Sequence, residues 1–152
     1  MKHAGFFHGG RGPRIQDRLT AMKKLHTVTA VIEAGTGLTL LAVPSLVVTL
    51  LLGSPLDSPV AVMLGRVTGA ALLALGLACW LARKDQSSPA TLGLVTAILV
   101  YNGSVAVLLA YAGTALGMSG RALWPAVVLH LLMAVWSVWC LKKRHNDPPP
   151  KA

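Results

Sequence analysis

Charged residues are scarce in this chain of 152 residues, whereas hydrophobic residues make up 54% of it. Asp, Glu, Lys and Arg together account for 12%, well below the roughly 25% that is usual in a soluble domain. Aromatic residues account for only 5%. The basic residues are therefore not interleaved with aromatic side chains on which bases would stack, so we expect no nucleic-acid partner.

Sequence motifs for metal binding and for catalysis are also missing. The two cysteines, Cys79 and Cys140, form no CxxC motif and no Cys/His cluster with zinc spacing. The chain has no P-loop, HExxH motif, Rossmann fingerprint or paired carboxylates. We therefore predict no metal site and no catalytic residue, and we expect a non-enzymatic protein without a required cofactor.

Long apolar stretches make up most of the sequence. A membrane-spanning helix needs about 20 mostly apolar residues, and four stretches reach that length. They are separated by turns rich in Pro, Gly or Ser and cover residues 26–52, 60–82, 90–112 and 122–141. We predict an all-α integral membrane protein in which residues 26–141 form a four-helix bundle within the lipid bilayer.

The segments outside these stretches are polar and basic. Residues 1–25 are expected to form a mobile tail, and residues 142–152 a polar tail. The N-terminal tail, the second loop and the C-terminal tail carry six, two and four Lys or Arg residues, whereas the first and third loops carry none and one. By the positive-inside rule, both termini are predicted to face the cytoplasm from a bacterial inner (plasma) membrane.

Four polar residues, Glu33, Arg66, Asn102 and His130, lie inside the apolar stretches. Polar groups are costly in hydrocarbon and usually face the interior of a helix bundle, so these residues are the candidates for ligand or proton binding. A helical rise of about 1.5 Å per residue places Arg66, Asn102 and His130 in one layer. The same estimate places Glu33 roughly 10 Å closer to the cytoplasm.

Glu33 and Arg66 each have more than one interpretation. A carboxyl group without a partner in hydrocarbon favours its protonated form, as a proton-coupled transporter requires. Alternatively, Glu33 is neutralised by Arg66, or by basic residues at the inner boundary, and only holds the bundle together. Arg66 stays charged, so it pairs with Glu33, binds an anionic group, or extends outward to lipid phosphate.

The remaining polar residues favour hydrogen bonds between helices. Asn102 is expected to bond to a neighbouring helix, and His130 to be either a hydrogen-bonded structural residue or a proton relay. Haem is not expected, because no second histidine lies at the depth of His130. Tyr101, beside Asn102, and Trp124, at the outer boundary, are weaker candidates for ligand contact.

Small residues form a helix-packing face in the second apolar stretch. Gly65 and Gly69 make a GxxxG pattern, which Ala70 and Gly76 extend. Because small residues let two helix backbones approach closely, we expect this face to contact another helix of the bundle.

The segment AVIEAGT at residues 30–36 resembles the first helix of small multidrug resistance transporters. In that family a lone Glu is followed closely by Gly-Thr and serves as the shared proton and drug site. The resemblance extends about one turn on either side of Glu33. It implies a proton-coupled small-molecule transporter that uses Glu33.

Over residues 33–140 the chain is loosely similar to uncharacterised bacterial four-helix membrane proteins of the DoxX-like kind. The similarity is carried by LGRVTGAALLALG at residues 64–76 and by LWPAVVLH at residues 123–130. Some DoxX-like proteins are linked to quinone-dependent redox complexes. This resemblance therefore implies a quinone-linked membrane redox component, with quinone or lipid as a bound molecule.

Three functions stay open on the sequence alone. The leading one is a non-enzymatic accessory, binding or assembly factor that acts with lipid, with other membrane-protein subunits or as a homo-oligomer. The others are a proton-coupled transporter and a quinone-linked redox component. A salt-bridged pair of Glu33 and Arg66 would favour the first, and an unpaired Glu33 in a water-accessible cavity the second. A slot open to lipid and lined by Arg66 and His130 would favour the third.

Overall fold

The computed structural model describes residues 13–85 and 88–145, and within these ranges the chain contains no β-strand. Five helices follow one another there: α1 (Pro13–Ala42), α2 (Pro44–Leu52), α3 (Pro59–Ala82), α4 (Pro89–Thr114) and α5 (Leu123–His145). Four of them, α1, α3, α4 and α5, contain segments long and apolar enough to cross a membrane. The prediction of an all-helical chain with four candidate spans is confirmed.

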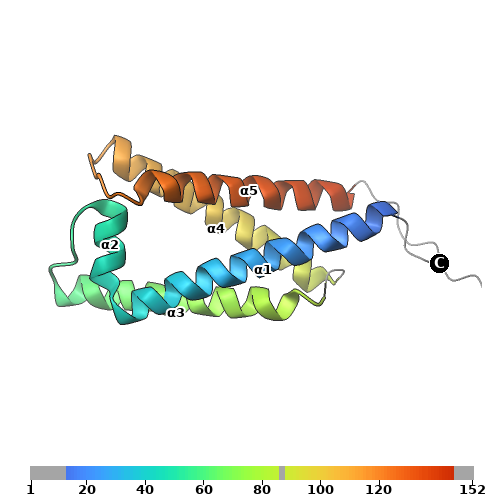
Figure 1. Ribbon diagram of the computed structural model, residues 1–152, viewed down its shortest axis with the longest axis horizontal. Coiled ribbons are helices and arrows are strands. Elements are labelled where there is room, and N and C mark those ends of the chain that lie inside the picture. Colours follow the sequence, from blue (N-terminus) through green and yellow to red (C-terminus); the bar gives the residue numbers. More distant parts are fainter. Residues whose placement is uncertain (1–12, 86–87, 146–152) are drawn as a thin grey trace, which may run out of the picture.

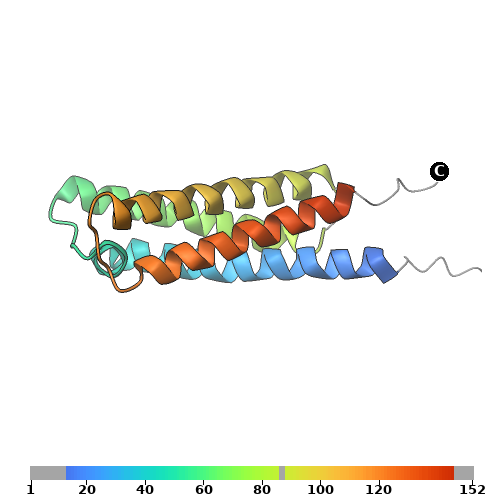
Figure 2. The same ribbon diagram turned by 90° about the horizontal axis from the view of Figure 1, so that it is seen from above.

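The four long helices run up and down along a common direction (Figure 1). The start of α1 and the end of α5 lie at the same end of the bundle, which we call the termini end (Figure 2). α1 packs along α3, α4 packs along α5, and α1 also contacts α5. The short helix α2 lies across the opposite end, the α2 end, and Figure 2 shows it nearly end-on.

Proline and serine set the starts of α3 and α4. Each helix begins at a proline, whose missing N–H costs little in a first turn. Ser58 and Ser88 precede the two helices, and their hydroxyl oxygens accept hydrogen bonds from the N–H groups of Ala61 and Thr91 at 3.1 and 3.2 Å. The expected spans 60–82, 90–112 and 122–141 correspond to α3, α4 and α5.

The first expected span, residues 26–52, is divided in the structure. α1 ends at Ala42 and α2 begins at Pro44, after Val43 with φ −136° and ψ 64°. Pro44 cannot donate the hydrogen bond that would continue the helix, and its ring would clash with the preceding turn. Gly53, at φ +84°, then ends α2. One long span is thus replaced by a shorter span and a crossing helix.

The expected mobile tail, residues 1–25, is also corrected where the structure describes it. α1 begins at Pro13, and Leu19, Met22 and Leu25 on its first turns are buried. Their spacing of three residues places them on one helix face. Residues 1–12 and 146–152, which make up much of the two expected tails, lie outside the described part of the chain.

Glycine allows α1 and α3 to pack closely. A Cβ atom added to Gly37 would lie 2.7 Å from the carbonyl oxygen of Gly69, and a Cβ added to Gly69 would lie 2.7 Å from that of Gly37. A Cβ added to Gly76 would lie 2.8 Å from the backbone nitrogen of Ala34. The expected small-residue face does contact another helix, but Ala70 is exposed and lies outside it.

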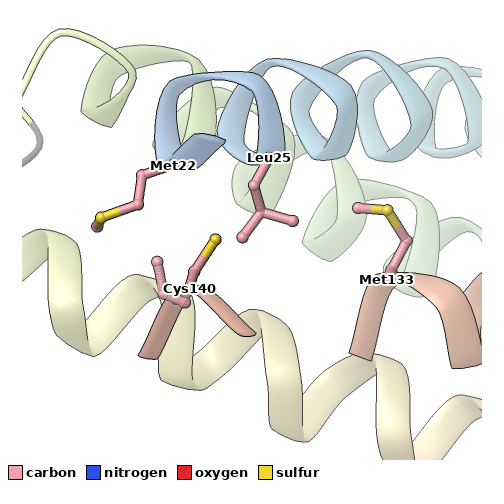
Figure 3. Close-up of a cluster of buried hydrophobic side chains, with 5 residues drawn as sticks. Met22, Leu25, Met133 and Cys140 are labelled. Carbon is pink, nitrogen blue, oxygen red and sulfur yellow. The ribbon is translucent and has the colours of Figure 1, made fainter. Parts of the chain in front are cut away.

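Two apolar layers fill the bundle near its ends. The termini-end layer consists of Met22, Leu25, Val95, Met133 and Cys140, from α1, α4 and α5. Figure 3 shows Met22 and Leu25 on the side of α1 that faces Met133 and Cys140. The α2-end layer consists of Ala112, Leu123 and Val127, with Leu52 of α2 packed against it. On α1, α4 and α5, the polar candidates occur between these layers.

Candidate functional site

Glu33 lies near the middle of the apolar part of α1. It is about nine residues, roughly 14 Å, from Lys24 on one side and from Ala42 on the other. The sequence-based estimate placed Glu33 nearer the cytoplasmic boundary because it counted only about seven residues from His26, the expected start of a span that ran to Leu52. The break at Pro44 moves the midpoint of the helix to Glu33, so its carboxyl group comes level with the polar residues of α4 and α5.

The Glu33 carboxyl group is enclosed by the bundle, since only 3% of the residue is exposed. Tyr101 of α4 donates a hydrogen bond from its hydroxyl group to Oε2 of Glu33 at 3.2 Å. Among the side chains that the structure describes, no Lys or Arg forms an ion pair with Glu33. A carboxyl group in this setting can carry a proton without placing a charge in the apolar interior.

His130 of α5 and Asn102 of α4 form a second hydrogen-bonded pair. Nδ1 of His130 lies 2.8 Å from Oδ1 of Asn102, and Nδ2 of Asn102 donates to the carbonyl oxygen of Ile98 at 2.8 Å. Because the amide oxygen can only accept, Nδ1 of His130 carries a hydrogen. Asn102 is 1% exposed and His130 is half-buried, so the pair extends from the bundle interior toward its surface.

Tyr101 joins the two pairs into one cluster. Its ring meets the His130 ring edge to face, with centroids 5.8 Å apart and planes at 81°, while its hydroxyl bonds to Glu33. We call Glu33, Tyr101, Asn102 and His130 the polar centre. Neutral His130 keeps Nε2 as an acceptor, so the cluster holds two groups that can exchange protons on either side of one tyrosine.

Arg66 lies apart from the polar centre. It is exposed on α3, and its neighbour Gly65 packs beside Pro44 at the α2 end, where an added Cβ would lie 2.9 Å from the proline Cβ. Gly76, about ten residues further along α3, packs against the turn of α1 that carries Glu33. Arg66 and Glu33 therefore differ in depth by roughly 15 Å.

This placement corrects two expectations about Arg66. Arg66 does not share a layer with Asn102 and His130, and in the described residues it does not pair with Glu33. Exposure in the first half of α3, toward the α2 end of the bundle, agrees with the third interpretation, in which the side chain extends along apolar surface toward lipid phosphate.

The weaker candidate Trp124 is also remote from the polar centre. It is exposed at the start of α5, where its Cζ2 would lie 3.2 Å from a Cβ added to Gly113. A groove of about 240 Å³ lies between α1 and α3 and is lined by apolar residues that include Val31, Leu77 and Trp80. Neither Arg66 nor His130 lines this groove, so it differs from the slot expected for a quinone-linked protein.

Two further polar residues, which were not singled out as site candidates, lie on the face of α1 that carries Glu33. His26 is fully buried and Thr29 is 1% exposed. Neither ring nitrogen of His26, nor Oγ1 of Thr29, makes a hydrogen bond in the described protein. Their spacing of three and four residues, from His26 to Thr29 and from Thr29 to Glu33, could have indicated that they share the helix face of Glu33. It was missed because His26 was assigned to the inner boundary of the span.

Among the described residues, no group of three or more His, Cys, Asp or Glu side chains could hold a metal ion. Cys79 and Cys140 lie in separate apolar clusters. Comparisons with protein-family models, with curated proteins and with solved structures found no match. The resemblances to small multidrug resistance transporters and to DoxX-like proteins therefore stay predictions.

Proposed function

We propose that this chain is a small, non-enzymatic, multi-pass membrane protein that couples proton binding at Glu33 to the movement of a small molecule across the membrane. The observation that carries the proposal is the environment of Glu33. This carboxyl group is buried halfway along α1, and its hydrogen-bond partner is a tyrosine hydroxyl and not a cation. A purely structural carboxylate at this depth would be expected to have a cationic partner.

The location that we propose is the bacterial inner (plasma) membrane, with the termini end of the bundle in the cytoplasm. Support comes from the distribution of Lys and Arg, of which six precede the first apolar stretch and four follow the last. The start of α1 and the end of α5, which are the described helix ends nearest to these basic residues, lie together at the termini end (Figure 2). Basic segments of this kind favour the cytoplasmic side.

The energetics of the site explain how a proton would be coupled to a change in helix packing. Burying a lone carboxylate costs several kcal/mol, whereas one hydrogen bond to a charged group contributes about 1.5–3 kcal/mol. The bond from Tyr101 therefore does not offset the cost of an ionised Glu33. Loss of the proton favours a packing of α1 against α4 in which Glu33 meets water or a cationic substrate.

Infrared spectroscopy of the reconstituted protein tests this proposal. The C=O stretching band of a protonated carboxyl group, identified by its absence in Glu33→Gln, is expected to weaken as the pH is raised from about 5 to about 9. Asp57, which lies exposed in the loop between α2 and α3, provides Asp57→Asn as the matched control. A Glu33 signal that stays constant over the whole range would contradict reversible proton binding.

An accessory or assembly factor is the second candidate function. It is favoured by the apolar layers on both sides of the polar centre, which fit a bundle whose hydrogen bonds mainly fix the packing of three helices. Co-purification from native membranes, followed by mass spectrometry of bound proteins, lipids and quinones, tests it. Partners that are retained by wild type and by Glu33→Gln alike would favour this function over the transporter.

A further inference from the structure

The face of α1 between the termini-end layer and Glu33 carries two buried side chains without hydrogen-bond partners. Both ring nitrogens of His26 and Oγ1 of Thr29 are enclosed and make no hydrogen bond within the described protein. The Met22 carbonyl of the preceding turn interacts with the imidazole, but without hydrogen-bond geometry. Because an unsatisfied polar group is costly in an apolar interior, these atoms indicate a further polar partner.

Thr29 differs from most of the other threonines in the described helices. Seven of them donate their hydroxyl hydrogen to the carbonyl oxygen four residues earlier: Thr20, Thr27, Thr39, Thr49, Thr68, Thr96 and Thr114. Thr29 is more deeply buried than these and yet does not make this bond. Its hydroxyl group is therefore available both as a donor and as an acceptor.

The spacing of the three polar residues suits water as the partner. Successive steps along α1 from His26 to Thr29 and from Thr29 to Glu33 rise by about 4.5 Å and about 6 Å. A single water molecule that makes two hydrogen bonds of about 2.8 Å spans up to about 5.6 Å. One bridging water covers the first step. In the second step the long Glu33 side chain leans back along the helix toward Thr29, which shortens the rise of about 6 Å so that one water can reach the carboxyl group.

We propose that His26, Thr29 and Glu33 form a water-bridged proton path that connects the polar centre with the termini end of the bundle. A proton arriving on one ring nitrogen of His26 releases the proton of the other nitrogen to the first water. That water passes a proton to the Thr29 hydroxyl group, which gives up its own to the second water. The last transfer converts the Glu33 carboxylate into a neutral carboxyl group.

The path opens toward one end only. On the α2 side of the polar centre, the layer of Ala112, Leu123 and Val127 supplies no polar side chain. At the termini end, the path must pass Met22 and Met133, whose flexible side chains can move aside more easily than branched ones. The titratable groups that neighbouring helices bring to the path are Cys79 of α3, Tyr101 of α4, and His130 and Cys140 of α5.

Deuterium exchange at the Glu33 carboxyl group tests the path, which rests on the proposed proton binding at Glu33. After transfer into D₂O, the shift of the C=O band reports when deuterium reaches this group. Thr29→Val and His26→Phe are expected to slow the exchange at least about tenfold, whereas Thr29→Ser keeps the hydroxyl group and the wild-type rate. Thr96→Val, at an exposed threonine of α4, is the matched control and leaves the rate unchanged.

A second pair of variants tests the direction of access. Met22→Ala in the termini-end layer is expected to accelerate the exchange, while Val127→Ala in the α2-end layer leaves it unchanged. A Glu33 band that titrates, with equal exchange rates in wild type, Thr29→Val and His26→Phe, would overturn the path and leave the proposed function standing. A band that does not titrate would overturn both, so the two failures are distinguishable.

Discussion

Replacing Gly37 by alanine tests the close packing of α1 against α3. The added Cβ would lie 2.7 Å from the carbonyl oxygen of Gly69 and 2.7 Å from the backbone nitrogen of Leu73, where ordinary contacts begin at 3.4 Å. Both neighbours are backbone atoms, so the two helices must move apart by about 0.7 Å. A gap of this size forfeits a quarter to a half of the dispersion energy of the atoms that separate.

The magnitude follows from two opposing terms. Alanine is favoured over glycine in a helix by about 0.5–1 kcal/mol, and overpacking a close contact costs about 1–3 kcal/mol. Gly35, two residues away on α1, has no atom within 4 Å of an added Cβ. Gly35→Ala therefore gains the helix preference of alanine without any overpacking. We therefore expect Gly37→Ala to be less stable than Gly35→Ala by about 1–3 kcal/mol.

The assay is reversible unfolding of the purified protein in mixed detergent micelles, followed by tryptophan fluorescence. Gly69→Ala is expected to resemble Gly37→Ala, and the double variant to lose less stability than the two single losses together, because the same pair of helices has already separated. Equal stability of Gly35→Ala and Gly37→Ala would refute the close approach of α1 and α3.

Two further predictions concern the polar residues and use the same unfolding assay. Tyr101→Phe removes the hydrogen bond to Glu33 but keeps the ring, and is expected to lower the free energy of unfolding by about 0.5–1.5 kcal/mol, whereas Tyr111→Phe, at an exposed tyrosine of α4, changes it little. A double-mutant cycle of Arg66→Leu and Glu33→Gln is expected to give a coupling below about 0.5 kcal/mol, as for distant sites. A coupling of several kcal/mol would instead show that Arg66 and Glu33 form a buried ion pair.

Hydropathy and turn residues predicted α3 and α4 well because their start signals are local. Pro59 and Pro89, each preceded by a serine cap, act within a single helical turn. The first span was predicted less well, because Pro44 is followed by the apolar segment of α2, so hydropathy alone continues through it. The turn of α2 across the bundle involves a contact distant in sequence, in which the N–H of Ala122 donates to the carbonyl oxygen of Leu50 at 2.8 Å.

The sequence singled out the residues of the polar centre more clearly than the contacts between them. Glu33, Asn102 and His130 stand out in any apolar stretch, but the partner of Glu33 depends on how each helix is rotated and where α1 ends. The expected partner, Arg66, turned out to be exposed, and Tyr101, a weaker candidate, makes the bond. His26 and Thr29 were overlooked because the boundary of the first span was misplaced by several residues.

The amino-acid sequence by itself determined that the chain is helical, that four helices are apolar enough to cross a membrane, and which few polar side chains must find partners inside. These properties depend on composition and on neighbours within a turn or two of helix. Only the tertiary structure decided which polar groups meet, because the break at Pro44 sets the depth of Glu33 and the glycine contacts set the rotation of α1 against α3. If the break or the helix contact were shifted by a few ångströms, the Glu33 carboxyl group would meet a different partner. No local sequence pattern encodes the position of one helix relative to another.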